Sequence, residues 1–340
     1  MKKNVNKLWV LLLIIGLISA AACAGQSDSP AISISGAAYL HYITDQNGNA
    51  EFTASRICLD LKRQLGDNVF RYTTDIDGSI GDYSVTDVSG NSLASSNKDY
   101  WTVYTKYLYV ELTKLLPGTS ILFGQFGTPW IGWVDKIHGF RYISKSMTDY
   151  FSVLSSADRG IGIKTKISDL NIEACLINGE GYKDADGADN RMDIAIRADW
   201  ASRGKDGLII GAHTQMSGTE TTGASCLESN KSVYNLLLGY MEGSDWTAAC
   251  EIAGGKKDGK SIQGISVFGN AALTDAVRAF GRYDQYDADT GTDNNDKKLI
   301  IAGIESCLAE KVKTSINMKQ TQTGSADALT TYYLDMEVGI

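Results

Sequence analysis

Hydrophobic and polar side chains alternate along most of this chain with a period of two. Between residues 108 and 113, Leu108, Val110 and Leu112 are apolar, and the remaining positions carry a tyrosine, a glutamate and a threonine. This period is that of a β-strand, whose successive side chains point to opposite faces. The two faces of such a strand are therefore expected to meet different surroundings.

Sixteen segments of this kind follow residue 31, and each is long enough to cross a bilayer as a tilted strand of about 9–11 residues. They cover residues 32–43, 50–63, 69–77, 99–114, 119–127, 159–167, 170–178, 191–201, 207–216, 232–241, 245–253, 261–271, 275–286, 297–308, 311–321 and 328–340. No segment after residue 25 has the length and apolar character of a membrane-spanning helix. The chain has only 3 prolines, which suits long paired strands because proline cannot donate to a β-ladder.

The connections between these segments alternate in length. The short ones are Gly66-Asp67-Asn68, Pro117-Gly118, Ser168-Asp169, Gly243-Ser244, Thr274 and Ala309-Glu310, with a looser link after Ala201. The others are mostly longer and polar, around residues 78–98, 128–158, 179–190, 217–231 and 287–296. Short turns at one end and long loops at the other are typical of an outer-membrane barrel. We therefore expect short periplasmic turns, long outer loops and both termini at the short-turn end.

The two strand faces fit the same interpretation. In RMDIAIRADW, residues 191–200, Met192, Ile194 and Ile196 share one face, and the arginines and aspartates share the other. A soluble β-sandwich would also alternate, but its polar face would meet bulk water. In a closed barrel the apolar face meets lipid, the polar face meets a wet lumen, and no strand edge is left exposed. The predicted fold is all-β: a closed antiparallel transmembrane β-barrel of about 16 strands over residues 32–340.

The N-terminus is predicted to be an export signal. Three lysines precede an apolar run at residues 8–22, and small residues follow it. Residues 1–24 are assigned to a signal peptide with cleavage after Ala22 or Ala24, and residues 25–31 to a short segment before the barrel. A lipoprotein acylated at Cys23 is the alternative. Removing the three lysines changes the formal net charge from −8 to −11, which argues against nucleic acid as a partner.

Three motifs invite a chemical interpretation, and each has a simpler one. GGKKDGKS, residues 254–261, fits the P-loop pattern, but a predicted strand follows where a helix N-terminus is needed. Residues 184–189 and 287–296 are rich in aspartate but lack the twelfth-position glutamate of an EF-hand, so solvated loops are expected. The cysteines form no CxxC pair. We expect neither a cofactor nor a metal site.

The longest loop, residues 128–157, carries the candidate constriction. Its aromatic residues would let it pack against a wall, and its charges would then meet the solute. The candidate residues of this loop are Asp135, Lys136, His138, Arg141 and Lys145. Alternation places these arginines on the lumen face: Arg56, Arg71, Arg191, Arg197, Arg278 and Arg282. The alternative is a lid outside the pore.

Several stretches of the chain resemble the bacterial outer-membrane porins of the phosphate-selective O and P type. They are FTASRICLDL, YVELTKLLPGTSILFGQFGTP, DRGIGIKTKI, LINGEG, GRYDQYDADTGT and the final TTYYLDMEVGI. The resemblance implies a sixteen-stranded, usually trimeric diffusion channel whose third outer loop, here 128–157, folds into the lumen. The chain departs from the family by ending in Ile340 instead of Phe or Trp, and by having Ser55-Arg56 where paired arginines are common. The resemblance therefore supports a porin more strongly than it supports selectivity for phosphate.

The expected function is passive diffusion of small hydrophilic solutes or ions through a homotrimeric outer-membrane porin in contact with lipid. A mild preference for anions is expected from the bases of the long loop. One alternative is a structural or adhesive barrel without an open pore. The other is a barrel enzyme, which would need a nucleophile and a base close together. His41, His138 and His213 are widely separated in the sequence, so no catalytic activity is expected.

Overall fold

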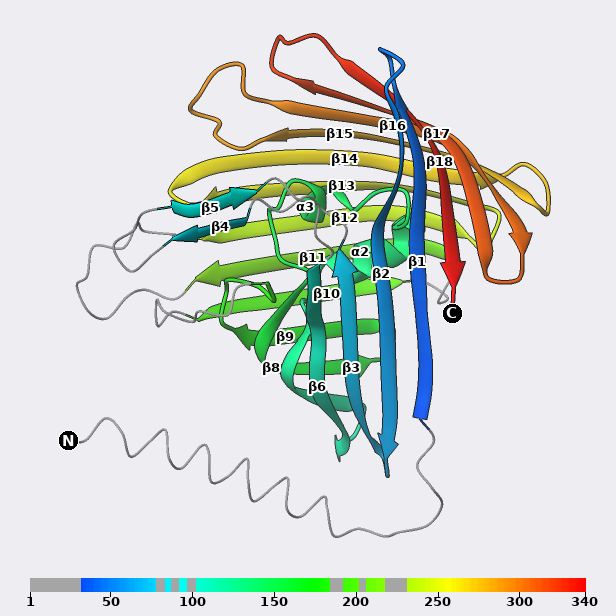
Figure 1. Ribbon diagram of the computed structural model, residues 1–340. Coiled ribbons are helices and arrows are strands. Elements are labelled where there is room, and N and C mark those ends of the chain that lie inside the picture. Colours follow the sequence, from blue (N-terminus) through cyan, green and yellow to red (C-terminus); the bar gives the residue numbers. More distant parts are fainter. Residues whose placement is uncertain are drawn as a thin grey trace.

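The computed structural model of the chain describes residues 32–77, 83–86, 92–96, 102–183, 192–201, 206–217 and 231–340. Within them, sixteen antiparallel strands form a closed barrel, as predicted (Figure 1). The expected signal peptide, residues 1–24, and the segment 25–31 lie outside the described residues, as do Arg191 and the acidic run 184–189. No helix in the described ranges is long and apolar enough to span a membrane.

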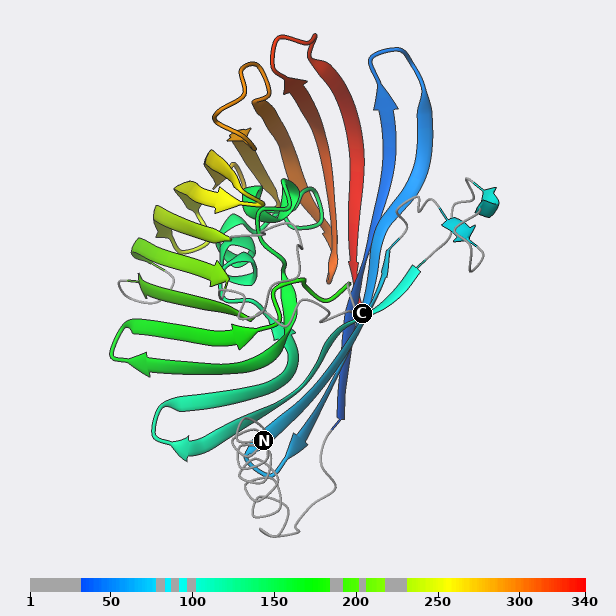
Figure 2. The same ribbon diagram turned by 90° about the vertical axis from the view of Figure 1, so that its left-hand side faces the viewer.

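The strand bounds follow the predicted segments closely. The barrel strands are β1 (Ile32–Asp45), β2 (Ala50–Leu65), β3 (Asn68–Asp77), β6 (Thr102–Leu116), β7 (Thr119–Gly127), β8 (Ala157–Ile167), β9 (Leu170–Ile177), β10 (Asp193–Ala201), β11 (Gly207–Ser217), β12 (Ser232–Glu242), β13 (Trp246–Lys257), β14 (Lys260–Ala272), β15 (Val277–Asp287), β16 (Lys297–Ala309), β17 (Val312–Thr323) and β18 (Leu329–Gly339). Each pairs with its neighbour in sequence order, and β1 closes the barrel by pairing with β18. A separate hairpin, β4 (Tyr83–Thr86) and β5 (Ser92–Ser96), lies outside the wall (Figure 2).

The short turns gather at one end of the barrel, but the opposite end is less uniform than predicted. Two of its connections, residues 46–49 and 258–259, are also short. Asp258 and Gly259 both have positive φ, at 52° and 76°, as a two-residue Asp-Gly hairpin turn requires. The P-loop-like motif is therefore a hairpin between β13 and β14, and no helix follows it.

The alternation along the strands places side chains as predicted. Leu108 on β6 has 47% of its surface exposed on the outside of the barrel, whereas Tyr109 is 8% exposed and faces inward. On β10, Ile194 and Ile196 are exposed and Asp193 is buried. The outer face is thus an apolar surface, and the lumen receives the polar and charged residues.

Register shifts occur in four described strand pairs of the barrel, and two of these irregularities bear on the lumen side of β2 and β6. The register shifts between Tyr39 and Leu40, where β1 pairs with β2, and leaves Ser55 as an extra residue in β2. It shifts again where β3 pairs with β6 and leaves Lys106 unpaired. Strict alternation places Lys106 with Leu108 on the lipid face, but the bulge turns its ammonium inward, 3.4 Å from Asp75.

The core of the molecule lies inside the barrel. The connection between β7 and β8, residues 128–156, is called here the inserted loop; it contains the helices α2 (Ile131–His138) and α3 (Met147–Tyr150). Both helices lie within the barrel in two views (Figures 1 and 2). Trp130, Ile131 and Val134 pack there with inward residues of β11 to β15.

Candidate functional site

The local sequence of the inserted loop determines which side of α2 faces water. Ile131, Val134 and Ile137 recur at helical spacing and are buried against the wall. Lys136 lies on the opposite side and is exposed. Gly139 ends the helix in the left-handed conformation, at a φ of 81°, and donates its N–H to a carbonyl of the last turn.

Two wall carboxylates hold the inserted loop at three points along its length. Glu251 on β13 is fully buried and accepts hydrogen bonds from Trp130 Nε1 at 2.7 Å and Thr148 Oγ1 at 3.3 Å. Glu305 on β16 accepts a hydrogen bond from Tyr142 OH at 2.8 Å. Because hydrogen bonds to charged acceptors are about twice as strong as neutral ones, these carboxylates fix the loop against this side of the lumen.

Wall cations bind the backbone of the inserted loop. Lys319 donates to the carbonyl of Ile143 at 2.6 Å. Arg197 donates to the carbonyl of Pro129, and Arg282 donates to the carbonyl of Lys145. Arg197 and Arg282, both predicted to line the pore, therefore also bind the backbone of the loop. Their charges are balanced locally, by Asp199 and Glu173 beside Arg197 and by Asp284 beside Arg282.

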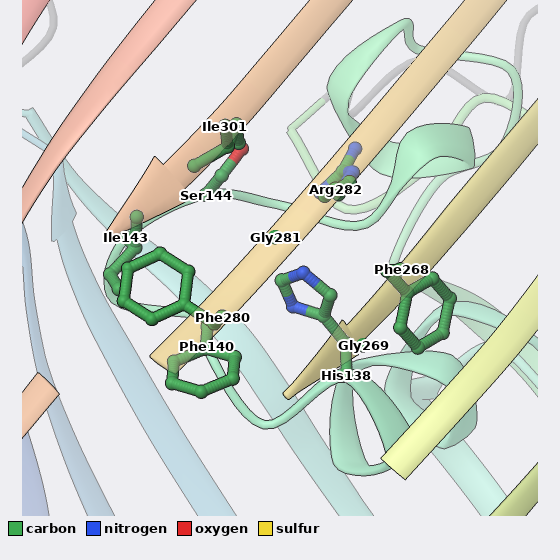
Figure 3. A pocket seen from close by; sticks show the side chains of 10 residues that line it. All are labelled: His138, Phe140, Ile143, Ser144, Phe268, Gly269, Phe280, Gly281, Arg282 and Ile301. Atoms are coloured by element: carbon green, nitrogen blue, oxygen red, sulfur yellow. The ribbon is translucent and has the colours of Figure 1, made fainter. Parts of the chain in front are cut away.

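The predicted site residue His138 lies in an apolar pocket. Its ring meets Phe140 and Phe268 edge to face, with ring centres 5.9 and 5.2 Å away, in the pocket of Figure 3. The cavity there is about 10 Å³, the size of one water molecule at most. Burial, assisted by Arg282 and Arg141, lowers the pKa of His138 well below its usual value. His138 is therefore neutral and brings no charge to the water-filled path.

Three of the four other candidates of the loop form one charged cluster with Asp149. Arg141 Nε lies 3.2 Å from Asp135, and its Nη2 lies 3.3 Å from Asp149. Lys145 lies 4.0 Å from the same Asp149, and Lys136 is exposed without an ion-pair partner among the described residues. Burial raises the pKa of Asp135, and the Asp149 charge adds to that rise, while Arg141 opposes it.

A second charged cluster faces the loop from β2, β3 and β6. Arg56 donates two hydrogen bonds to Asp75, at 2.9 and 3.1 Å, and Lys106 approaches the same carboxylate. Arg71 donates to Asp60 at 2.7 Å. These residues all lie on the side of the barrel with the two bulges, and the register shift at β6 is what adds Lys106 to them.

Aromatic rings mark where the two clusters approach. The rings of Tyr39 on β1 and Tyr142 on the loop are 6.4 Å apart. Tyr182, in the connection after β9, is influenced by both clusters. Burial raises its pKa, and the carboxylates of Asp75 on the wall and Asp149 on the loop raise it further. These contacts make the space between the charged clusters of the inserted loop and of strands β2, β3 and β6 the candidate constriction.

An open cavity of about 570 Å³ lies next to the loop cluster, toward the long-loop end. Lys145 and Asp149 line it, together with Tyr182 and Lys231. It lies beside the candidate constriction. Arg278 lies elsewhere, because it donates to Asn270 and to the carbonyl of Ser244 at the short-turn end. Among the described residues, no group of His, Cys, Asp or Glu is arranged to hold a metal ion.

Sequence reasoning missed two residues of this site. Lys106 was not among the predicted site residues, because strict alternation from Leu108 would place it on the lipid face. Tyr182 belongs to a loop that no pattern connects with the lumen. A signal existed for Lys106: a lysine on the lipid face of a transmembrane strand costs about 2–4 kcal/mol near the midplane. Such a cost makes a bulge the better interpretation of TKYLYVEL.

Solved structures with the same arrangement are outer-membrane proteins. A mutant of the Rh. blastica porin matches with a TM-score of 0.62 and 13% identity, over 91% of this chain and 100% of that chain. The in-vitro folded trimer form of OmpT from Vibrio cholerae matches with a TM-score of 0.60 and 12% identity, over 92% and 100%. The chain has the outer-membrane porin fold. No protein-family model and no curated protein matches the sequence.

The Glu251 anchor gives a first prediction. Glu251→Ala removes the acceptor of both Trp130 Nε1 and Thr148 Oγ1 and leaves a buried indole N–H unpaired, at a cost of about 1–3 kcal/mol. The loop should then move within the lumen. We expect single-channel currents in planar bilayers to fluctuate more, around a mean conductance above that of the wild type.

The matched control is Glu242→Ala. Glu242 accepts a hydrogen bond of the same kind and length, 2.7 Å, from Trp246 Nε1, but this pair is exposed and far from the loop. Its removal should leave current noise and conductance unchanged. Equal noise in Glu251→Ala and the wild type would show that Glu251 does not hold the loop in place.

Proposed function

We propose that this protein is a passive porin of a bacterial outer membrane, open to small hydrophilic solutes and ions. The short-turn end faces the periplasm, and the long-loop end faces the outside of the cell. The barrel assembles as a homotrimer with lipid around it; the trimer form of OmpT, which shares the fold, supports this. Diffusion needs no catalytic step and no resident cofactor.

The observation that carries this proposal is the charge on both sides of the constriction. The inserted loop packs on the inner faces of β10 to β17, whereas the wall of β2, β3 and β6 keeps partly exposed Arg56 and Arg71. A barrel with a blocked lumen would bury that wall under apolar contacts. Charged groups of both signs along a wet path are instead what a diffusion channel needs.

A preference for anions follows from how these ion pairs are oriented. In every described ion pair except Lys106 with Asp75, the basic side chain is more exposed than its acidic partner. In the constriction, Lys145 is 49% exposed and Asp149 is 12% exposed. A passing ion therefore meets the cations first. Because the sequence resembles phosphate-selective porins, inorganic phosphate is included among the anions to be tested.

Single-channel conductance of the refolded protein tests the proposal. Insertion into a planar bilayer should give discrete, ohmic current steps in KCl, because partly exposed charged side chains line the proposed path beside the loop. Addition of phosphate at constant chloride should reduce the chloride current if phosphate enters the same constriction. A folded barrel that inserts without current steps would contradict the porin and favour a structural barrel.

A further inference from the structure

A serine, a histidine and an aspartate meet on the lumen wall and belong to neither of the two charged clusters described above. His41 on β1 is buried, and its Nδ1 lies 2.6 Å from Asp335 Oδ1 on β18. Its Nε2 lies 2.7 Å from Ser55 Oγ on β2. The three strands are neighbours in the barrel, in the order β18, β1, β2. Ser55 is 14 positions from His41 in the sequence, whereas Asp335 is 294 positions away.

The hydrogen bonds of this group suit one tautomer of His41. An ionised aspartate only accepts, so the tautomer that donates Nδ1–H to Asp335 leaves Nε2 to accept from the Ser55 hydroxyl. Asp335 is fully buried, and its second oxygen accepts from Asn317 Nδ2 at 2.8 Å. The carboxylate is thus fixed from both sides and fixes the imidazole in turn. This is the arrangement of nucleophile, base and orienting acid by which hydrolytic triads are recognised on unrelated folds.

Ser55 is accessible although its partners are buried. It is the extra residue of the β2 bulge, and its side chain is exposed. The bulge lets Ser55 reach His41 even though the next residue, Arg56, also turns into the lumen, where it pairs with Asp75. A guanidinium beside the nucleophile favours the negative charge that develops on a substrate carbonyl oxygen.

We propose that Ser55, His41 and Asp335 hydrolyse small carboxylic esters that enter the lumen. Ser55 Oγ forms a bond to the ester carbonyl carbon while its proton passes to His41 Nε2. The tetrahedral intermediate then expels the alcohol, which takes that proton, and leaves an acyl group on Ser55. A lumen water, activated by His41, attacks the acyl carbon, releases the carboxylic acid and restores the Ser55 hydroxyl. Ser55 is the nucleophile, His41 the general base and acid, and Asp335 a positioning residue.

The test uses the refolded full-length barrel in detergent with two probes. A small dialkyl fluorophosphate should form a bond from its phosphorus to Ser55 Oγ with loss of fluoride, and peptide mass spectrometry should locate the adduct there. Hydrolysis of p-nitrophenyl acetate should fall to background in Ser55→Ala. It should fall roughly 10³-fold or more in Asp335→Asn, because the imidazole then loses its orientation.

The control is Thr53→Ala, since Thr53 lies directly opposite His41 in the ladder but the His41 ring nitrogens bond elsewhere. This variant should keep both labelling and hydrolysis. Electrophoretic migration without boiling shows which variants form the closed barrel, and the exposed position of Ser55 keeps Ser55→Ala decisive. Absence of the Ser55 adduct in folded wild-type protein, or equal hydrolysis by wild type and Ser55→Ala, would overturn the proposal. Conductance should be the same in wild type and Ser55→Ala, so this test is independent of the porin function.

Discussion

Reversing three bases of the inserted loop should turn the proposed anion preference of the channel into a preference for cations. Under a KCl gradient, the reversal potential of the wild type should lie on the chloride side. That of Lys136→Glu/Arg141→Glu/Lys145→Glu should lie on the potassium side. Lys136 and Lys145 are exposed. Charges in a narrow passage with low-dielectric walls dominate over those of wide, salt-screened vestibules.

Two further variants separate position from net charge. Lys260→Glu/Lys297→Glu/Lys298→Glu makes the same change in net charge at the long-loop end, away from the constriction, and should shift the reversal potential little. Lys136→Glu/Lys145→Glu leaves Arg141 with its two aspartates and should shift it in the same direction as the triple variant, but less. If the triple variant keeps the wild-type reversal potential, the loop does not govern selectivity.

Leu334→Arg should destabilise the barrel by about 2–4 kcal/mol, the cost of an arginine on the lipid face near the midplane. Leu334 lies in the middle of β18, and 47% of its surface is exposed on the outer side. Urea titration of the barrel folded in lipid vesicles, followed by tryptophan fluorescence, measures the change in the free energy of unfolding.

Glu337→Arg is the matched control on the same strand. Glu337 faces the lumen, where it makes a solvated ion pair with Lys313 at 3.4 Å. Losing that pair costs at most about 1 kcal/mol, since exposed ion pairs contribute little. Equal destabilisation by the two arginines would mean that the faces are not lipid and water, because a shift of one residue exchanges them.

The strands of this protein could be predicted because their signal is local. Alternation reports the two faces of each strand, and pairs such as Pro117-Gly118 or Asp258-Gly259 mark where a chain reverses. Neither signal depends on knowing which strand lies beside which. The bounds of β1 to β18 therefore fall within a few residues of the predicted segments, apart from the hairpin β4–β5, which the long link at 78–98 concealed.

The site was predicted only in part, because its contacts join residues far apart in sequence. The loop and its charged residues were predicted, but not the carboxylates that hold it, such as Glu251 beneath Trp130 or Glu305 beneath Tyr142. Alternation showed which wall residues face inward but not how deep along the barrel each of them lies. It therefore placed Arg282 in the pore without showing that its charge is used by Asp284 and the loop backbone.

By itself, the sequence determined the β class, the strand bounds and the division between an apolar and a charged face, since each depends on residues two positions apart. The tertiary structure alone decided the exceptions. A bulge, which reflects the register of two strands, moved Lys106 from the lipid side to the lumen. Closure of the barrel brought the first strand beside the last and placed His41 between Ser55 and Asp335. Such contacts depend on which strands become neighbours, and alternation along one strand carries no information about its neighbour.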